Sequence, residues 1–572
     1  MSSWEQRERA RTILSREVGC IRKPHADRLR IALAFPNTYF VGMSSLGFQA
    51  VYRLFGDRDD TVAERVFLPP KQELAEALRA GVRLITLESQ TPVADFDVLA
   101  FSVSFEWDYP NLLTMLRLSG LPVRAADRDL RHPLVALGGA TSFLNPEPLA
   151  PFVDVVCAGE GEVLVPSLVE AARSGGGRAE VLRRLAAQPG MYVPSLIDVR
   201  YGAGGAITSF DPVDGSSARA PVAKAALRTA EMADPPATTV FSPDTEFGSR
   251  LLVEVVRGCA NLCRFCWAGY NYLPVRPFGA DRILRIAEAA RPHSARVGLV
   301  SIALCDHPEI ERILARLLEL GYHISPASLR LDDLTEPIVR MLRQGGERSI
   351  TIAPETGSDR LRRVINKIIT NDQILDRAEL AFASGVESLK LYFMIGLPTE
   401  QDDDLVAIRD LTVRLREVML HHARGRGTVG RIVASVNPLV PKPGTAYQWL
   451  AMEDPEVTER KMRRLRQLVA GLDNVHFTIK SERHAFYQAL LSLGDRRVAP
   501  VIEEAERNGG QWRAACATAG VDPGWYVFRD RSGDRVLPWD IIGGSAPPGF
   551  LRSEFERGLR EEPTWRQGLT PR

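Results

Sequence analysis

The chain contains no apolar run long enough to cross a bilayer, and its first residues lack the apolar stretch of a secretory signal. It has almost no net charge, because 72 Lys and Arg residues balance 71 Asp and Glu residues. No overall field therefore favours nucleic acid or an anionic membrane surface. The 7 cysteines are too few for a disulfide scaffold in 572 residues. These absences predict a cytoplasmic protein without a membrane span.

The length is too great for one hydrophobic core and predicts several domains. Residues 1–175 alternate short apolar runs with helical patterns, which predicts a doubly wound α/β domain with a parallel sheet. Strands are expected at 30–35, 82–87, 98–103 and 134–137, and helices around 47–55 and from near 111 and 161. Ligands of such sheets lie outside the carboxyl ends of the strands. Ser102, Gly138 and Gly139 occupy such ends.

The rest of the chain divides into three further regions. Residues 176–248 are rich in glycine and are expected to form a connecting region. Residues 249–452 repeat strand and helix six times, which predicts a partial (β/α)6 barrel of the TIM type with its chemistry at the carboxyl ends of the strands. Residues 453–572 are expected to be mainly helical. The expected barrel strands are 251–256, 297–302, 323–328, 349–353, 388–393 and 431–436.

Three of the cysteines fall within eight residues. Cys259, Cys263 and Cys266 form a Cys-x3-Cys-x2-Cys pattern directly after the first expected barrel strand. Thiolates are soft ligands that suit iron–sulfur clusters, and three of them leave one iron of a 4Fe-4S cube open. A zinc site and chance clustering are the alternatives. Structural zinc normally takes four protein ligands, whereas the next Cys or His candidates, His293 and Cys305, lie about thirty residues away.

At this motif the sequence resembles the radical S-adenosylmethionine (SAM) superfamily, and the resemblance extends through the expected barrel. It implies that Cys259, Cys263 and Cys266 hold a 4Fe-4S cluster whose open iron chelates SAM. An electron from the cluster would then cleave SAM to a 5′-deoxyadenosyl radical. By the same resemblance, further residues would contact SAM: Phe265, Ser301, Glu355, Ser358 and Gly396. The segment at Ser301 lacks the glutamate that many members have there.

The N-terminal region resembles the cobalamin-binding subclass of this superfamily, an uncharacterised family of cobalamin-binding-domain radical SAM proteins. Residues 35–47, 138–148, 158–162 and 537–540 carry this resemblance. It implies a Rossmann-like domain of the cobalamin-binding type, with Ser102, Gly138 and Gly139 near cobalamin. His25 and His132 lack the usual Asp-x-His-x-x-Gly context, so we expect no histidine below the cobalt. The alternative is a degenerate domain kept for substrate binding or architecture.

Three functions follow from the sequence as alternatives. The first is a cobalamin-dependent radical SAM methyltransferase acting on a carbon centre of an unknown substrate. The second is a radical SAM enzyme that cyclises, oxidises or modifies nucleic acid without methyl transfer. The third is a non-catalytic iron–sulfur protein that senses redox state or binds RNA. The first two need an external reductant such as flavodoxin or ferredoxin; nucleic acid as a partner is not favoured.

Overall fold

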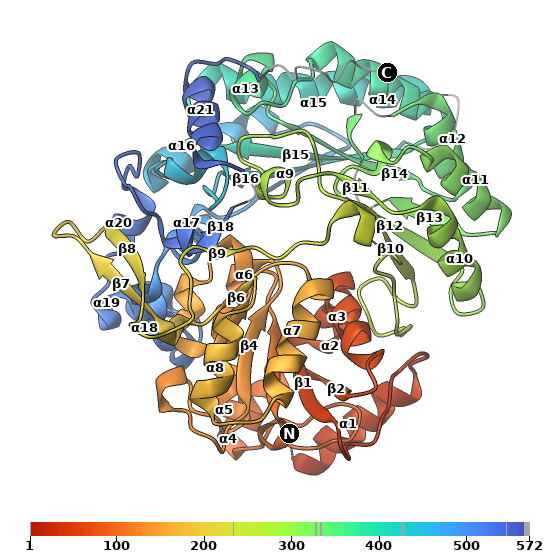
Figure 1. Cartoon of the computed structure of the whole chain (residues 1–572). Coiled ribbons are helices and arrows are strands. Elements are labelled where there is room, and N and C mark those ends of the chain that lie inside the picture. The colour runs from red at the N-terminus through yellow and green to blue at the C-terminus, as the bar shows by residue number, and fades with distance from the viewer. Residues whose placement is uncertain are drawn as a thin grey trace.

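The computed structural model describes residues 2–564, except 233, 327–328, 332–333, 425–426, 428 and 545. In Figure 1 the N-terminal α/β domain lies below the strands of the barrel, and the C-terminal helices run along one side of both. The expected fold class is confirmed: a doubly wound domain is followed by a partial barrel and a mainly helical C-terminal region. The domain boundaries inferred from the sequence stay predictions.

The N-terminal domain is built on a six-stranded sheet in the order β2-β1-β3-β4-β5-β6. Strands β1 to β5 are parallel and β6 is antiparallel. The strands are β1 Leu29–Thr38, β2 Thr61–Leu68, β3 Val98–Ser102, β4 Leu134–Gly138, β5 Val155–Cys157 and β6 Met191–Tyr192. The helices around it are α1 Ser3–Ser15, α2 Tyr39–Gly42, α3 Leu46–Gly56, α4 Lys71–Ala80, α5 Tyr109–Leu118, α6 Thr141–Leu144, α7 Gly161–Arg173 and α8 Arg178–Ala186.

Alternation along β1 shows how this sheet is covered on both faces. Ile31 and Leu33 face a core shared with α3 and α7, whereas Ala32 and Ala34 face a second core. This second core also contains residues of the C-terminal helices and of the barrel loops. Because a strand buried on both faces needs apolar residues throughout, β1 was recognisable in the sequence as a continuous apolar run.

One expected strand, 82–87, is wrong. Leu84 and Leu87 are buried, but their segment is irregular and forms only an isolated bridge from Ile85 to Pro92. The edge of the sheet is instead β2, which contains Glu64 and Arg65. Charged residues usually indicate an exposed segment, so β2 is not recognisable as a buried strand in the sequence. Here the charges are buried because they are paired within a polar network.

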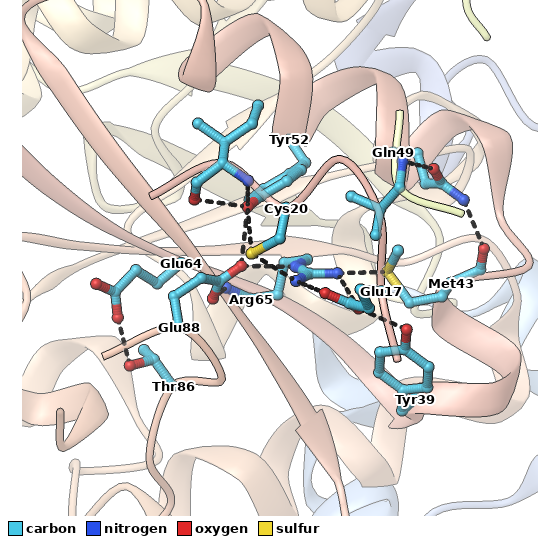
Figure 2. A network of polar contacts seen from close by, with 12 residues as sticks. Glu17, Cys20, Tyr39, Met43, Gln49, Tyr52, Glu64, Arg65, Thr86 and Glu88 are labelled. Carbon is cyan, nitrogen blue, oxygen red and sulfur yellow. Dashed lines mark hydrogen bonds and ion pairs between the residues drawn. The ribbon is translucent and has the colours of Figure 1, made fainter. Parts of the chain in front are cut away.

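Arg65 is the centre of that network, which Figure 2 shows. Its guanidinium donates two hydrogen bonds of 2.7 Å to Glu17 and one of 2.6 Å to Glu88. The Tyr52 hydroxyl donates to Glu88, and the Tyr39 hydroxyl donates to Glu17. The network therefore ties the segment after α1 to the edge strand and to helices α2 and α3.

The barrel consists of two four-stranded sheets, in the orders β11-β10-β12-β13 and β14-β15-β16-β17. All neighbouring strands are parallel except the short β11. All six expected strands are present, although residues 327–328 of the third lie outside the described residues. The strands are β10 Leu251–Arg257, β11 Arg276–Pro277, β12 Arg296–Ser301, β13 His323–Pro326, β14 Ser349–Glu355, β15 Ser388–Ile395, β16 Ile432–Pro438 and β17 Val475–Ile479. The helices are α9 Trp267–Asn271, α10 Ala280–Ala290, α11 Ile310–Glu319, α12 Glu336–Gln344, α13 Asp359–Val364, α14 Asn371–Ala383 and α15 Asp402–Ala423.

The region after residue 453 is mainly helical; among its described residues there are two strands, β17, which extends the barrel sheet, and β18 Ile542–Gly543. β18 pairs with β9 Val222–Ala223, and β7 Ile197–Tyr201 forms a hairpin with β8 Ile207–Pro212. The helices are α16 Pro455–Val469, α17 Glu482–Leu493, α18 Ala499–Arg507, α19 Trp512–Ala519, α20 Pro523–Val527 and α21 Pro548–Leu559. Within the described part of the chain, no helix is both long and apolar enough to span a membrane.

Candidate functional site

A cavity of about 490 Å³ lies where the two α/β domains meet. From the N-terminal domain it is lined by Ser102, Gly138 and Gly139, at the ends of β3 and β4. From the barrel it is lined by Gly258 and Ser301, at the ends of β10 and β12. Both sheets thus point the carboxyl ends of their strands at one space, which is where ligands of such sheets bind.

The part of the cavity inside the N-terminal domain is an apolar slot between the sheet and helices α3 and α7. Its walls come from small and branched residues of β1, β3 and β4 and from the two helices: Leu33, Ala50, Leu54, Ala100, Ala136 and Leu164. Among the described residues that line the cavity there is no histidine. His25 instead lies 2.7 Å from Glu64, and His132 lies beside Asp129.

Gly139 shows how closely the backbone is packed at the mouth of this slot. Its φ of +92° lies in the left-handed region, and a Cβ built there would be 2.7 Å from the backbone nitrogen of Val103. Only glycine meets both conditions without strain. The Gly138-Gly139 pair therefore brings main chain, rather than side chain, to the cavity wall.

The cysteine loop begins immediately beyond β10. Cys259 is buried, and Cys263 and Cys266 are half-buried. Burial raises the pKa of the Cys263 thiol to about 12, and burial likewise raises the pKa of Cys266. Cys259 adds to both shifts through its own charge, so the three thiols are near neighbours. The backbone N–H groups of Ala268 and Gly269 donate to the Cys266 sulfur and oppose its rise.

The donors of the cysteine loop are three thiols that are close in the sequence. In the described ranges, no three Cys, His, Asp or Glu side chains form a group able to hold a single metal ion. A structural zinc ion normally takes four protein ligands, whereas the three thiolates of a 4Fe-4S cluster with one open iron each bind a different iron. Three soft sulfur donors on one loop are a donor set that fits such a cluster.

The fourth barrel strand ends beside the cysteine loop. Glu355, the last residue of β14, has a φ of +66° and accepts a 3.0 Å hydrogen bond from the Lys367 ammonium. Burial would lower the pKa of Lys367, but the charges of Glu355 and Cys263 outweigh it and raise that pKa. The positive φ of Glu355 and this half-buried ion pair make the end of β14 a candidate site. Lys367 was missed in the sequence because it belongs to no motif.

The other residues expected at SAM lie at strand ends of the same edge. The Ser301 hydroxyl accepts a 3.0 Å hydrogen bond from the Ala303 N–H. Ser358 is the N-cap of α13, where its hydroxyl accepts from the Leu361 N–H at 3.3 Å. Gly396 has a φ of +77° and donates its N–H to Glu400 at 2.8 Å. Phe265 is half-buried against the core that joins the domains.

The structure thus brings the expected site residues together only in part. Ser301 shares the cavity with the expected cobalamin residues Ser102, Gly138 and Gly139. Glu355 lies with the cysteines instead, as its effect on the pKa of Cys263 and Cys266 shows. Gly258, which lines the cavity and precedes Cys259, connects the two groups.

Two family models match the chain. Residues 47–194 match the model for the N-terminal region of radical SAM proteins, and residues 253–412 match that for the radical SAM superfamily. The first contains β2 to β6, and the second contains the cysteine loop and strands β10 to β15 apart from the first residues of β10. The chain is therefore a member of the radical SAM superfamily.

The chain is also similar to individual proteins in sequence or in fold. The uncharacterized protein MJ0966 of Methanocaldococcus jannaschii is 26% identical over 479 residues, which are 83% of this chain and 90% of that protein. Among solved structures, the radical SAM methyltransferase TsrM from Kitasatospora setae, with cobalamin and a 4Fe-4S cluster bound, shares the fold. It has a TM-score of 0.53 at 11% identity, over 86% of this chain and 98% of that chain. The cobalamin-dependent radical SAM enzyme OxsB has a TM-score of 0.44 at 14% identity; the match covers 68% of this chain but only 52% of OxsB.

Proposed function

We propose that this protein is a cobalamin-dependent radical SAM enzyme that methylates a carbon centre of its substrate. One observation carries the proposal: a single cavity is lined both by the strand ends of the N-terminal sheet and by the residues that flank the cysteine loop. A cobalt cofactor and SAM bound at these two walls would face one another across the same space.

The cysteine loop is the proposed cluster site. Cys259, Cys263 and Cys266 supply three soft ligands whose burial limits access by water. Their raised pKa values mean that cluster assembly must displace protons that the thiols hold firmly. The N–H groups of Ala268 and Gly269 aimed at Cys266 would stabilise its thiolate.

SAM is proposed to bind along the barrel edge next to the loop. Glu355 and Ser358 would accept or donate hydrogen bonds at its polar groups, and the positive φ of Gly396 turns the main chain at this edge. Ser301 stands on the wall shared with the N-terminal domain, and Phe265 would pack beside the adenine. Lys367 holds Glu355 in place and adds a positive charge close to the thiols.

Cobalamin is proposed to occupy the N-terminal wall of the cavity. The apolar slot suits the nucleotide tail, and Ser102 and the Gly138-Gly139 main chain would contact the corrin amides. When bound, these groups would supply a 5′-deoxyadenosyl radical from SAM and a methyl group carried on cobalt. The chain's own residues hold both and exclude water.

Product analysis tests this function. Reconstituted protein with SAM, hydroxocobalamin and a flavodoxin or dithionite reductant, supplied with candidate substrates, should yield 5′-deoxyadenosine, S-adenosylhomocysteine and a methylated product. If 5′-deoxyadenosine forms without S-adenosylhomocysteine or a methylated product, the protein is a radical SAM enzyme that does not transfer a methyl group. A cluster without any SAM cleavage would select a redox-sensing or RNA-binding protein. The proposal also predicts an external one-electron donor as partner.

A further inference from the structure

The C-terminal helix α21 and the residues after it reach the cysteine loop. Arg264, between Cys263 and Phe265, forms an ion pair with Glu554 of α21 at 3.2 Å. Both side chains are buried, with exposed fractions of 0% and 2%. In Figure 1, α21 lies against α13, beside the barrel and away from the N-terminal domain. Residues that are nearly three hundred positions apart therefore meet directly at the proposed cluster site.

Every nitrogen of the Arg264 guanidinium is used. Nη1 donates to the carbonyls of Arg363 and Val364, at 3.0 and 2.9 Å. Nη2 donates to the carbonyl of Glu562 at 2.7 Å and to the Thr564 hydroxyl at 3.2 Å. The Thr564 hydroxyl in turn donates to Glu554. The side chain thus binds the end of α13 and the C-terminal segment together.

A second anchor holds the middle of the cysteine loop. The carbonyl of Leu262 accepts hydrogen bonds from the Tyr270 hydroxyl at 2.9 Å and from the Asn366 amide at 3.2 Å. Leu262 and Asn366 both have a positive φ, of 50° and 55°. The Thr564 N–H donates to the other end of the Asn366 amide at 3.0 Å. The C-terminal segment therefore supports the loop at both anchors.

The packing of α21 leaves little freedom at this contact. A Cβ added at Gly558 would lie 3.0 Å from the Arg264 Cδ and 3.1 Å from the Val364 carbonyl oxygen. Glu561 pairs with Arg360 of α13, and Phe555 packs on Trp449 with ring centroids 5.9 Å apart. The helix is docked by charge, close approach and aromatic contact at once.

We propose that α21 and residues 560–564 are part of the cluster-binding unit, with Arg264 and Glu554 as positioning residues that set the shape and the electrostatics of the cysteine loop. The inference rests on the proposed cluster at Cys259, Cys263 and Cys266. A buried charge pair next to a cluster tunes its reduction potential, because reduction adds negative charge. Removing the carboxylate leaves an uncompensated cation beside Cys263, and removing the guanidinium leaves an uncompensated anion.

The test compares Glu554→Gln with Arg264→Gln, and uses Glu556→Gln, an exposed position on the same helix, as the matched control. After anaerobic reconstitution with iron and sulfide, redox titration followed by electron paramagnetic resonance gives the midpoint potential of each protein. We expect a higher potential for Glu554→Gln, a lower one for Arg264→Gln and the wild-type value for Glu556→Gln. Shifts of the same sign, or no shift in either variant, would overturn the inference.

A second measurement needs no cluster. In the metal-free protein, limited proteolysis followed by mass spectrometry reports how often the C-terminal segment opens. Thr564→Ala removes the hydroxyl that joins Arg264 to Glu554 without touching the core, so it covers the case in which Glu554→Gln fails to fold. We expect cleavage within residues 546–564 to be roughly tenfold faster in Thr564→Ala than in wild type, and unchanged cleavage would overturn the anchoring. If wild type takes up no cluster, the proposed function fails, while this comparison still decides whether the segment holds the loop.

Discussion

Arg257 of the barrel donates a 2.9 Å ion-paired hydrogen bond to Glu162 of the N-terminal domain, directly before the cysteine loop. The same guanidinium lies 3.0 Å from Glu160 and 2.7 Å from Glu254. Burial would lower the pKa of Arg257, but Glu254 and Glu162 raise it. Glu160 and Glu162 are at the start of α7, so these contacts fix the end of β10 to the N-terminal domain. Arg257 and the two glutamates also line the cavity.

Replacing this arginine should therefore destabilise the joint between the domains. Arg257→Met leaves three carboxylates around a buried site with one cation fewer, and breaking a buried pair costs about 3–5 kcal/mol. Urea unfolding should show a loss of that order. Arg296→Met, at an exposed position at the start of β12, is the control and should change stability little. Equal stability of Arg257→Met and Arg296→Met would contradict the claim that Arg257 stabilises the contact between the two domains.

The network at Arg65 makes a second stability prediction. Arg65→Met leaves the buried carboxylates of Glu17 and Glu88 without their cation, so it should also lower the free energy of unfolding by about 3–5 kcal/mol. Arg30→Met is the comparison, because Arg30 pairs with Asp97 at a site where both side chains are 37% exposed. That pair should be worth at most about 1 kcal/mol. If urea unfolding gives similar losses of stability for Arg65→Met and Arg30→Met, burial does not make the Arg65 network more stabilising than an exposed ion pair.

Gly139 supplies a test of the cobalamin wall. Gly139→Ala places a Cβ against Val103 at a positive φ, so it should distort the β4 end and abolish cobalamin binding. Gly175→Ala is the matched control, because Gly175 also has a positive φ, of 67°, but has open space around it. It should cost only about 1 kcal/mol and retain binding. Absorbance titration with hydroxocobalamin distinguishes them, and tight binding by Gly139→Ala would exclude this wall.

Asp108 predicts a pH dependence. Burial raises the pKa of this carboxyl to about 6, against the opposing hydrogen bonds from Asn37 and Asn111. Because the pKa is higher in the folded state, the folded protein binds the proton more tightly than the unfolded chain does. The stability that this provides is fully present below the unfolded pKa, near 3.9, and is lost as the pH rises to about 6. Asp108→Asn keeps an acceptor for Asn37 and should be more stable than wild type by about 2–3 kcal/mol above pH 6.

Thermal unfolding across pH 4 to 8 measures the effect of Asp108→Asn. The gain over wild type should grow between about pH 4 and 6 and then stay constant. Asp127→Asn, at an exposed position of the same domain, should follow the wild-type curve. A gain in Asp108→Asn that does not depend on pH would contradict the assigned ionisation.

The sequence predicted strands that contain runs of apolar residues. Apolar runs revealed β1, β3, β4 and the six barrel strands, and the cysteine spacing located the loop after β10. The pattern failed at β2, whose Glu64 and Arg65 are buried in a polar network, and at β17, where half-buried and exposed residues alternate in a charged region. At residues 82–87 Leu84 and Leu87 are buried, but the segment forms an isolated bridge and no strand.

A local motif located the cysteine loop, whereas no local motif reveals contacts between distant segments. Cys259, Cys263 and Cys266 were assigned as ligands from their spacing and from the family resemblance, and this role stays a prediction. Lys367 beside Glu355 and Glu554 beside Arg264 depend on tertiary packing, and no local pattern distinguishes them from surface charges. The common cavity depends on the relative position of the two domains, which no local pattern in the sequence gives.

The central claim is that the cysteine loop holds a 4Fe-4S cluster. Iron and acid-labile sulfide determination on anaerobically reconstituted protein tests it most directly, with the triple variant Cys259→Ala, Cys263→Ala, Cys266→Ala and the control Cys516→Ala, at a buried cysteine of α19. Wild type and Cys516→Ala should each hold about four irons and four sulfides per chain, and the triple variant close to none. Iron retained by the triple variant, or a single zinc in wild type, would contradict the account.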